Sequence, residues 1–208
     1  MGELGTIPPV TTVSLKILKD FCNKFTVPDH KLDEMIHAIK ANEQKRIFEE
    51  WLTQHRGLLF KVVRAYAFKP HDQDDLFQEI TTQVWNSVPN YRGDSAVTTW
   101  IYRVALYSAM AWSKKERRHR ENHQAISADD RPLLQPSTHE NPQLDWLYEQ
   151  ISDLDEIDRS LTLLMLEGFS YLEIGATMGI SQSHVGVKLN RIKKRLIEQS
   201  KKEQKHGV

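Results

Sequence analysis

Glycine is almost missing from the middle of this chain, and this feature most constrains what the chain can fold into. Between Gly57 and Gly168 the only glycine is Gly93. Apolar residues in the same stretch recur every three or four positions rather than at every second one. A period of three to four is typical of amphipathic helices, whereas alternation is typical of strands. The sequence therefore predicts an all-α fold.

Three helices are predicted in the first half of the chain, each from an apolar stripe. The first covers about residues 43–68 and is ended by Pro70, which cannot continue a helix. The second has His71 and Asp72 as candidate N-caps, and the third runs into the basic sequence KKERRHR. Because the connections between them are short, we expect one small helical domain over residues 31–118.

The next segment, residues 119–143, contains three of the eight prolines and no sustained apolar stripe, so it is predicted to be a flexible linker. Four helical segments follow and make a second small helical domain, residues 144–208; they are expected at about residues 144–152, 156–167, 171–178 and 182–200. Residues 1–30 form an N-terminal extension with one short helix expected around residues 14–23.

Composition excludes several classes of protein. The single cysteine, Cys22, can form neither an intrachain disulfide nor a cysteine-rich zinc site. No apolar run approaches a membrane span and the first residues lack the order of a signal peptide, so we expect a cytoplasmic protein without membrane insertion. His119 and His123 have helical spacing but no third ligand nearby. We therefore expect no metal and no cofactor.

Charge is balanced overall, with 28 Lys and Arg against 28 Asp and Glu, but it is unevenly distributed. Residues 145–167 contain seven acids and one base. Residues 114–120 contain five bases and one acid, and the stretch from Lys188 to the end contains eight bases and two acids. Local basic stretches can bind nucleic acid even in a neutral chain.

The most specific local motif is GFSYLEIGATMGISQSHVGVKLNRIKKRL. Ser170 and Glu173 form a capping box, Gly179 suits a tight turn, and Ser181 can cap the next helix. This pattern is typical of a helix-turn-helix, whose second helix enters the major groove of DNA. An ordinary helical hairpin with solvated bases is the alternative. Polar residues off the apolar stripe of the second helix are candidates for contacts with bases or phosphates: Gln182, Ser183, His184, Lys188 and Arg191.

A second informative segment begins at DDLFQEITTQVW. Asp75, Gln78 and Glu79 share a polar helical face that suits either solvent or a charged partner helix, and spacing alone favours solvent. Downstream, aromatic residues are interleaved with bases, as single-stranded DNA requires for stacking and for phosphate neutralisation. The alternative is that most of these rings belong to the core, which we favour for Tyr102 and Trp112.

Taken in order, DDLFQE, a helix ending in VW, NYRGDS, TWIYRVA, a basic helix end, a proline-rich linker and GFSYLEIGATMGIS resemble an extracytoplasmic-function (ECF) sigma factor of bacterial RNA polymerase. The resemblance covers about residues 31–199. It implies sigma domain two over residues 31–118, which binds core polymerase and the minus-ten element, and a helix-turn-helix sigma domain four over residues 144–208. Such a protein is not an enzyme: it directs core polymerase to specific promoters and helps to melt DNA for transcription initiation.

Two rival functions remain at this point. A LuxR-type DNA-binding transcriptional regulator has a similar helix-turn-helix, but it leaves DDLFQE and the aromatic and basic third helix unexplained. An enzyme is disfavoured because the sequence contains no nucleophile elbow, P-loop or paired metal ligands.

The resemblance also implies roles for individual residues. Asp75, Gln78 and Glu79 would bind core polymerase. The second helix of the helix-turn-helix would read the minus-thirty-five duplex. Ten residues would contact the minus-ten element: Asn90, Tyr91, Arg92, Ser95, Thr98, Trp100, Arg103, Tyr107, Lys114 and Lys115. The implied partners are core RNA polymerase, promoter DNA and an anti-sigma factor that the sequence does not identify. The acidic stretch would suit either a basic surface of the polymerase flap or solvent.

Overall fold

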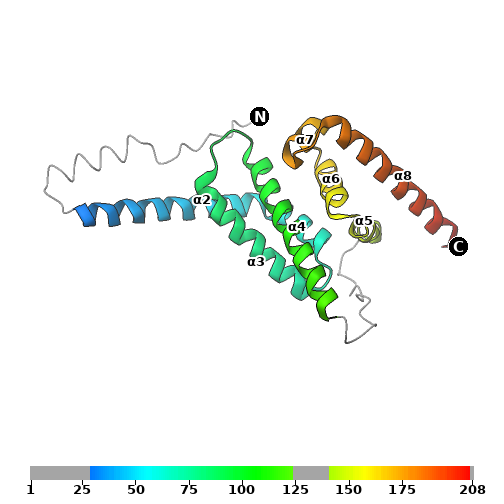
Figure 1. The fold of residues 1–208 in the computed structure, drawn as a ribbon, viewed down its shortest axis with the longest axis horizontal. Coiled ribbons are helices and arrows are strands. Elements are labelled where there is room, and N and C mark those ends of the chain that lie inside the picture. The colour runs from blue at the N-terminus through cyan, green and yellow to red at the C-terminus, as the bar shows by residue number, and fades with distance from the viewer. Residues whose placement is uncertain (1–28, 124–140, 207–208) are drawn as a thin grey trace.

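A computed structural model describes residues 29–123 and 141–206, and every regular element within these ranges is a helix. Figure 1 labels the α-helices α2 to α8. A short 3-10 helix, η1, follows α3. Their bounds are α2 Asp29–Tyr66, α3 Pro70–Ser87, η1 Val88–Asn90, α4 Val97–His123, α5 Pro142–Ser152, α6 Glu156–Leu166, α7 Tyr171–Met178 and α8 Gln182–His206. The predicted all-α fold is confirmed. The helix expected around residues 14–23 lies outside the described residues.

The first half of the chain forms a three-helix unit, because α2, α3 and α4 each contact the other two. The predicted stripe of α3, Leu76, Ile80 and Val84, is fully buried. It packs with apolar residues of α2 and α4, among them Leu59 and Ile101. Burial of each such side chain contributes about 1.5–3 kcal/mol, so this stripe holds the three helices together.

Helix ends in this half differ from the prediction. Helix α2 begins at Asp29, fourteen residues before the predicted start, and its first part extends away from the bundle. Leu32, Ile36 and Ile39 have helical spacing in this part, so the sequence contained a short apolar pattern that the prediction left out. Most of the described side chains there are exposed, Ile39 among them, and Lys, Glu and Ala favour helix. The predicted caps His71 and Asp72 are wrong: Lys69 is the N-cap without a side-chain bond, and Pro70 occupies the first turn. Helix α4 continues to His123, five residues into the predicted linker.

The second half contains α5 to α8 at positions close to those predicted. The Asn141 side chain caps α5 by accepting from two backbone N–H groups, and Asp155 caps α6 by accepting from Asp158 N at 2.8 Å. Ile174 of α7 and Leu189 of α8 are fully buried against α6. Local caps and short apolar stripes therefore define these helices as the sequence indicates.

The two halves also pack against each other, which the sequence did not indicate. Helix α2 contacts α5 and α6, and α4 contacts α6 and α7, so that one buried cluster continues from the first half into the second. Figure 1 shows α5 to α8 lying along one side of the α2–α4 unit. No helix in the described ranges is long and apolar enough to cross a membrane.

Candidate polymerase and nucleic-acid interfaces

The predicted helix-turn-helix is built from α7, a tight turn and α8. The Ser170 backbone N–H donates to the Glu173 carboxylate at 2.8 Å, and the Glu173 backbone N–H donates to Ser170 Oγ at 3.3 Å. Hydrogen bonds from the Ser170 hydroxyl and backbone hold the pKa of Glu173 below its usual value. Gly179 adopts a left-handed conformation with φ of 70°, and Ser181 Oγ accepts from His184 N at 3.2 Å. All of these local predictions are confirmed.

Gly175 sets how closely the two helices of this motif approach, a role that the sequence pattern did not reveal. Its carbonyl accepts from the backbone N–H of Ile180 at 3.0 Å. A Cβ atom at position 175 would lie 2.7 Å from the Ile180 carbonyl oxygen, which is too close for an unshifted backbone. Glycine at this position therefore allows the turn to fold back onto α7.

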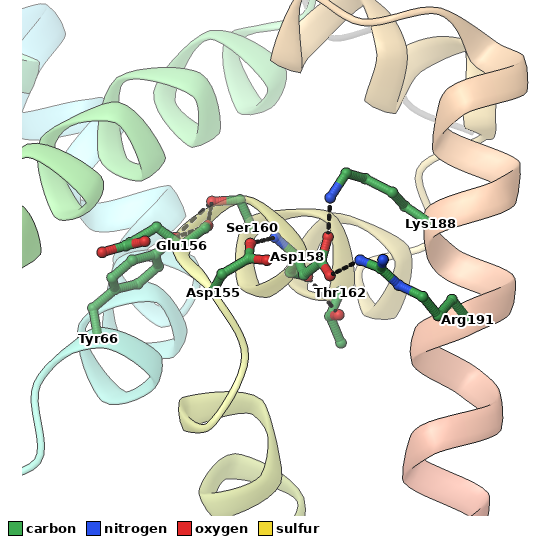
Figure 2. Close-up of polar contacts among 8 residues, drawn as sticks. All are labelled: Tyr66, Asp155, Glu156, Asp158, Ser160, Thr162, Lys188 and Arg191. Atoms are coloured by element: carbon green, nitrogen blue, oxygen red, sulfur yellow. Dashed lines mark hydrogen bonds and ion pairs between the residues drawn. The ribbon is translucent and has the colours of Figure 1, made fainter.

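Recognition-helix residues fall into two groups. Gln182, Ser183 and His184 are exposed at the start of α8, as expected for residues that meet DNA. Lys188 and Arg191 instead bind one buried carboxylate of α6, as Figure 2 shows: Lys188 Nζ lies 2.6 Å and Arg191 Nη2 2.9 Å from the oxygens of Asp158. Asp158 has a side-chain exposure of only 7%, Lys188 of 19% and Arg191 of 68%. Lys188 is thus held against α6, whereas most of Arg191 faces solvent.

The three residues of the predicted polymerase contact, Asp75, Gln78 and Glu79, are exposed together on the side of α3 opposite its buried stripe. Glu79 Oε1 accepts from Gln83 Nε2 at 2.9 Å, and Asp75 Oδ2 lies 3.4 Å from His71 Nδ1. These contacts along the helix organise an acidic and polar surface, which we call the α3 face.

Residues predicted to meet the minus-ten element lie on the α3–α4 loop and on α4. In the loop, Asn90, Arg92 and Ser95 are exposed. Tyr91 and Trp100 are half-buried: the Tyr91 ring packs against buried Trp51 and against Trp100, with centroid distances of 5.2 and 5.7 Å.

Two hydrogen bonds fix this pair of rings at the base of the loop. The Tyr91 hydroxyl donates to the Ser95 carbonyl at 2.6 Å, and Trp100 Nε1 donates to Ser87 Oγ at 3.1 Å. Tyr91 and Trp100 therefore shape the loop, and its exposed rim is made by other side chains.

On α4, the predicted residues Arg103, Tyr107, Lys114 and Lys115 are exposed. The guanidinium of Arg103 lies 5.9 Å from the Tyr107 ring centroid. Thr98, the second residue of α4, is half-buried. The exposed side chains form a basic and aromatic surface, which we call the α4 stripe. Tyr102 is completely buried and Trp112 packs partly against the core, in agreement with the core assignment of these two rings.

Tyr66 lies at the centre of the contact between the two halves, with an exposure of 2%. Its hydroxyl donates to the Glu156 carbonyl at 2.7 Å and lies 2.6 Å from Ser160 Oγ, as seen in Figure 2. The Arg159 guanidinium lies 4.7 Å from the Tyr66 ring centroid. Burial raises the pKa of Tyr66 to about 12, so the phenol is neutral in this contact at ordinary pH.

The partner of the acidic stretch was an open question, and three of its acids besides Asp158 bind bases of the first half. Asp145 forms an ion pair with Arg64. Glu156 accepts from Arg117 at 2.7 Å, and Glu167 accepts from Lys61 at 2.5 Å. The Arg64 guanidinium also lies 4.2 Å from the ring centroid of Tyr148 on α5. None of these bases belongs to the α3 face or the α4 stripe, so both surfaces stay exposed while the halves are packed.

Two family descriptions match the chain at the two halves just described. Sigma-70 region 2 matches residues 51–119, and Sigma-70, region 4 matches residues 144–196. ECF RNA polymerase sigma factor SigE of Mycolicibacterium smegmatis is 26% identical over 155 residues, which cover 72% of this chain and 60% of that protein. The chain belongs to the ECF sigma factors.

Other relatives agree with this assignment. The ECF RNA polymerase sigma-E factor of Escherichia coli is 27% identical over 156 residues, covering 69% of this chain and 81% of that protein. The solved sigma factor RpoE of Bartonella quintana, in complex with the anti-sigma factor NepR, has the same fold with a TM-score of 0.63 and 18% identity, covering 75% of this chain and 98% of that one. As an ECF sigma factor, the chain directs RNA polymerase to promoters and is not an enzyme. The region 2 match removes the LuxR-type alternative.

Proposed function

We propose that this sigma factor uses three separate surfaces in promoter recognition. The α3 face binds core RNA polymerase, the α3–α4 loop with the α4 stripe binds the unpaired minus-ten strand, and the start of α8 enters the minus-thirty-five major groove. The observation that carries this proposal is that all three surfaces are exposed although the two halves are packed together. The proposal includes a cytoplasmic location, because the polymerase works there.

The chemistry of the α4 stripe suits single-stranded DNA. Tyr107 exposes an aromatic ring beside the Arg103 guanidinium, so a base can stack while a phosphate is neutralised. Stacking contributes about 1–3 kcal/mol per base, which offsets part of the cost of unpairing the duplex. The exposed side chains of Arg92 and Ser95 extend the same surface along the loop.

Binding both promoter elements requires the two halves to separate. The elements lie about 25 base pairs apart, or about 85 Å at roughly 3.4 Å per base pair. In the packed arrangement α4 contacts α6, and α6 contacts α8. Axes of packed helices lie about 10 Å apart, so the axes of α4 and α8 lie about 20 Å apart. The distal end of each helix lies about 20 Å from its midpoint, so the two helices together reach at most about 60 Å. The packed chain is therefore too small to reach both elements, and we propose that polymerase binding opens it.

An anti-sigma factor is a further proposed partner. The complex of Bartonella quintana RpoE with NepR supports this extension, because that protein shares the fold of this chain. The α3 face is the surface we assign to it, since an inhibitor that covers this face blocks polymerase binding directly.

Charge reversal on the α3 face tests polymerase binding. Asp75→Lys combined with Glu79→Lys should abolish co-purification with core polymerase while helicity stays unchanged, because both side chains are exposed. Asp33→Lys combined with Glu34→Lys is the matched control, since these exposed acids on α2 give the same charge change away from the α3 face. Undiminished co-purification of the first variant would show that polymerase binds elsewhere.

The DNA surfaces are tested by comparing templates. Tyr107→Ala should lower holoenzyme transcription from a duplex promoter far more than from a template already mismatched over the melted bases. The reason is that stacking on Tyr107 offsets part of the free energy needed to unpair the duplex. Phe60→Ala removes an equally exposed ring from α2 and should leave the ratio between the two templates unchanged. Equal losses on both templates for Tyr107→Ala would assign this residue to duplex binding or folding.

A further inference from the structure

The face of α8 that points away from the protein is centred on an apolar side chain. Val185, Leu189 and Ile192 are buried on one side of α8. The opposite side, at spacings of four, three and four residues, carries Ser183, Val187, Asn190 and Lys194. Val187 is 71% exposed, more than any other large apolar side chain in the part of the chain that the structure describes.

Packing on both flanks of α8 leaves this line as the surface that can enter a groove. On one flank Lys188 is drawn back to the buried carboxylate of Asp158. On the other, a Cβ atom at Gly186 would contact the ring of Tyr171 at an ordinary distance of 3.6 Å, so α7 covers that side. The Val187 side chain therefore lies in solvent and not in the hydrophobic core. A helix-turn-helix presents this side of its second helix to DNA.

We infer that Val187 reads the methyl group of a thymine in the minus-thirty-five major groove and that Asn190 binds an adenine beside it. Thymine is the only base with a methyl group in the major groove, and it contacts apolar side chains. An asparagine amide can bind adenine through its N6 and N7 atoms. Three residues of helix rise about 4.5 Å and one base-pair step about 3.4 Å, so the two side chains match neighbouring base pairs. This inference rests on the proposed role of α8.

The same geometry gives the other residues of α8 different tasks. Arg191 keeps 68% of its side chain exposed while one nitrogen binds Asp158, so it is oriented toward the edge of the groove, where phosphates lie. Lys194 continues the outward line one turn beyond Asn190. The charges thus position the helix on the backbone, and the neutral pair Val187 and Asn190 supplies sequence preference.

The test uses holoenzyme assembled from the full chain and core polymerase. The preferred minus-thirty-five duplex is first selected from a randomised library, and each thymine in it is then replaced by deoxyuridine, which lacks only the methyl group. We expect one replacement to weaken wild-type binding about fourfold, as for loss of one buried methyl-sized group, and to have no effect on Val187→Ala. Asn190→Ala should relax preference at the neighbouring adenine.

Matched controls keep the outcome interpretable. Ile197→Ala removes another exposed apolar side chain of α8, about three turns beyond Val187, and should retain the full deoxyuridine response. Val187→Ala replaces an exposed valine with a better helix former, so circular dichroism should show an unchanged fold. A deoxyuridine response that is absent, or equal in wild type and Val187→Ala, overturns the inference while the selected element still supports the role of α8. Failure of the library to yield any minus-thirty-five preference overturns that role itself.

Discussion

The pairing of Lys188 with Asp158 gives the most quantitative prediction from this structure. Asp158→Asn keeps the size of the side chain but removes the negative charge that accepts from Lys188 at 2.6 Å and from Arg191 at 2.9 Å. Exposed ion pairs contribute about 0.2–1 kcal/mol, whereas loss of one partner of a buried pair costs about 3–5 kcal/mol. With exposures of 7% for Asp158 and 19% for Lys188, this pair lies between those limits. We expect Asp158→Asn to lower the free energy of unfolding by about 2 kcal/mol.

Double-mutant cycles separate the contributions of Lys188 and Arg191 to the stability of their contacts with Asp158. Lys188→Met combined with Asp158→Asn should give a coupling energy of about 1–1.5 kcal/mol. The cycle with Arg191→Met should give less than about 0.5 kcal/mol, because 68% of the Arg191 side chain is exposed. Raising the salt concentration should weaken the Arg191 coupling more than the Lys188 coupling, since exposed charges are screened first.

Urea unfolding of the full chain, followed by circular dichroism, is the measurement. Lys194→Met is the matched control: it removes an exposed lysine of the same helix and should change stability by no more than about 0.5 kcal/mol. If the effects of Lys188→Met and Asp158→Asn simply add, Lys188 is not held by Asp158. It would then be available to DNA, as the sequence pattern alone suggested.

Three further predictions concern the turn and the contact between the halves. Gly175→Val should unfold the helix-turn-helix, because even a Cβ atom would lie 2.7 Å from a backbone oxygen. Gly186→Ala should keep or raise the melting temperature. Equal melting temperatures of the two variants would contradict this expectation. Burial raises the pKa of Tyr66 to about 12 from 10.0, so its contribution to stability should be complete below pH 10 and lost as the pH rises from 10 toward 12. Burial raises the pKa of Tyr102, Tyr148 and Tyr91 as well, so ultraviolet titration should show several late-ionising phenols. Tyr66→Phe should remove one of them, and an unchanged curve would refute the assignment. Arg64→Asp should separate the two halves and so increase the radius of gyration measured by X-ray scattering. Adding Asp145→Arg should reverse this increase. An unchanged radius of gyration in both variants would contradict the observed ion pair.

The helices of the second half were predictable because their determinants are local. The capping box of Ser170 and Glu173, the left-handed Gly179 and the apolar stripe of α8 each involve residues only a few positions apart. The order of motifs also identified the family correctly. The start of α2 was missed although Leu32, Ile36 and Ile39 have helical spacing. Most described side chains of these first turns are exposed, so this short apolar pattern does not correspond to a buried face.

By itself, the sequence determined most of the helical segments, where the helix-turn-helix lies and which family the chain belongs to, since these depend on local spacing and on motif order. Only the tertiary structure decided which charges meet. Lys188 and Asp158 are 30 positions apart, and the bases that pair with Asp145, Glu156 and Glu167 come from the other half of the chain. It also decided that Tyr91 packs against Trp51 while Val187 points into solvent. Spacing specifies one face of a helix, but the neighbours that cover or expose that face come from distant parts of the chain.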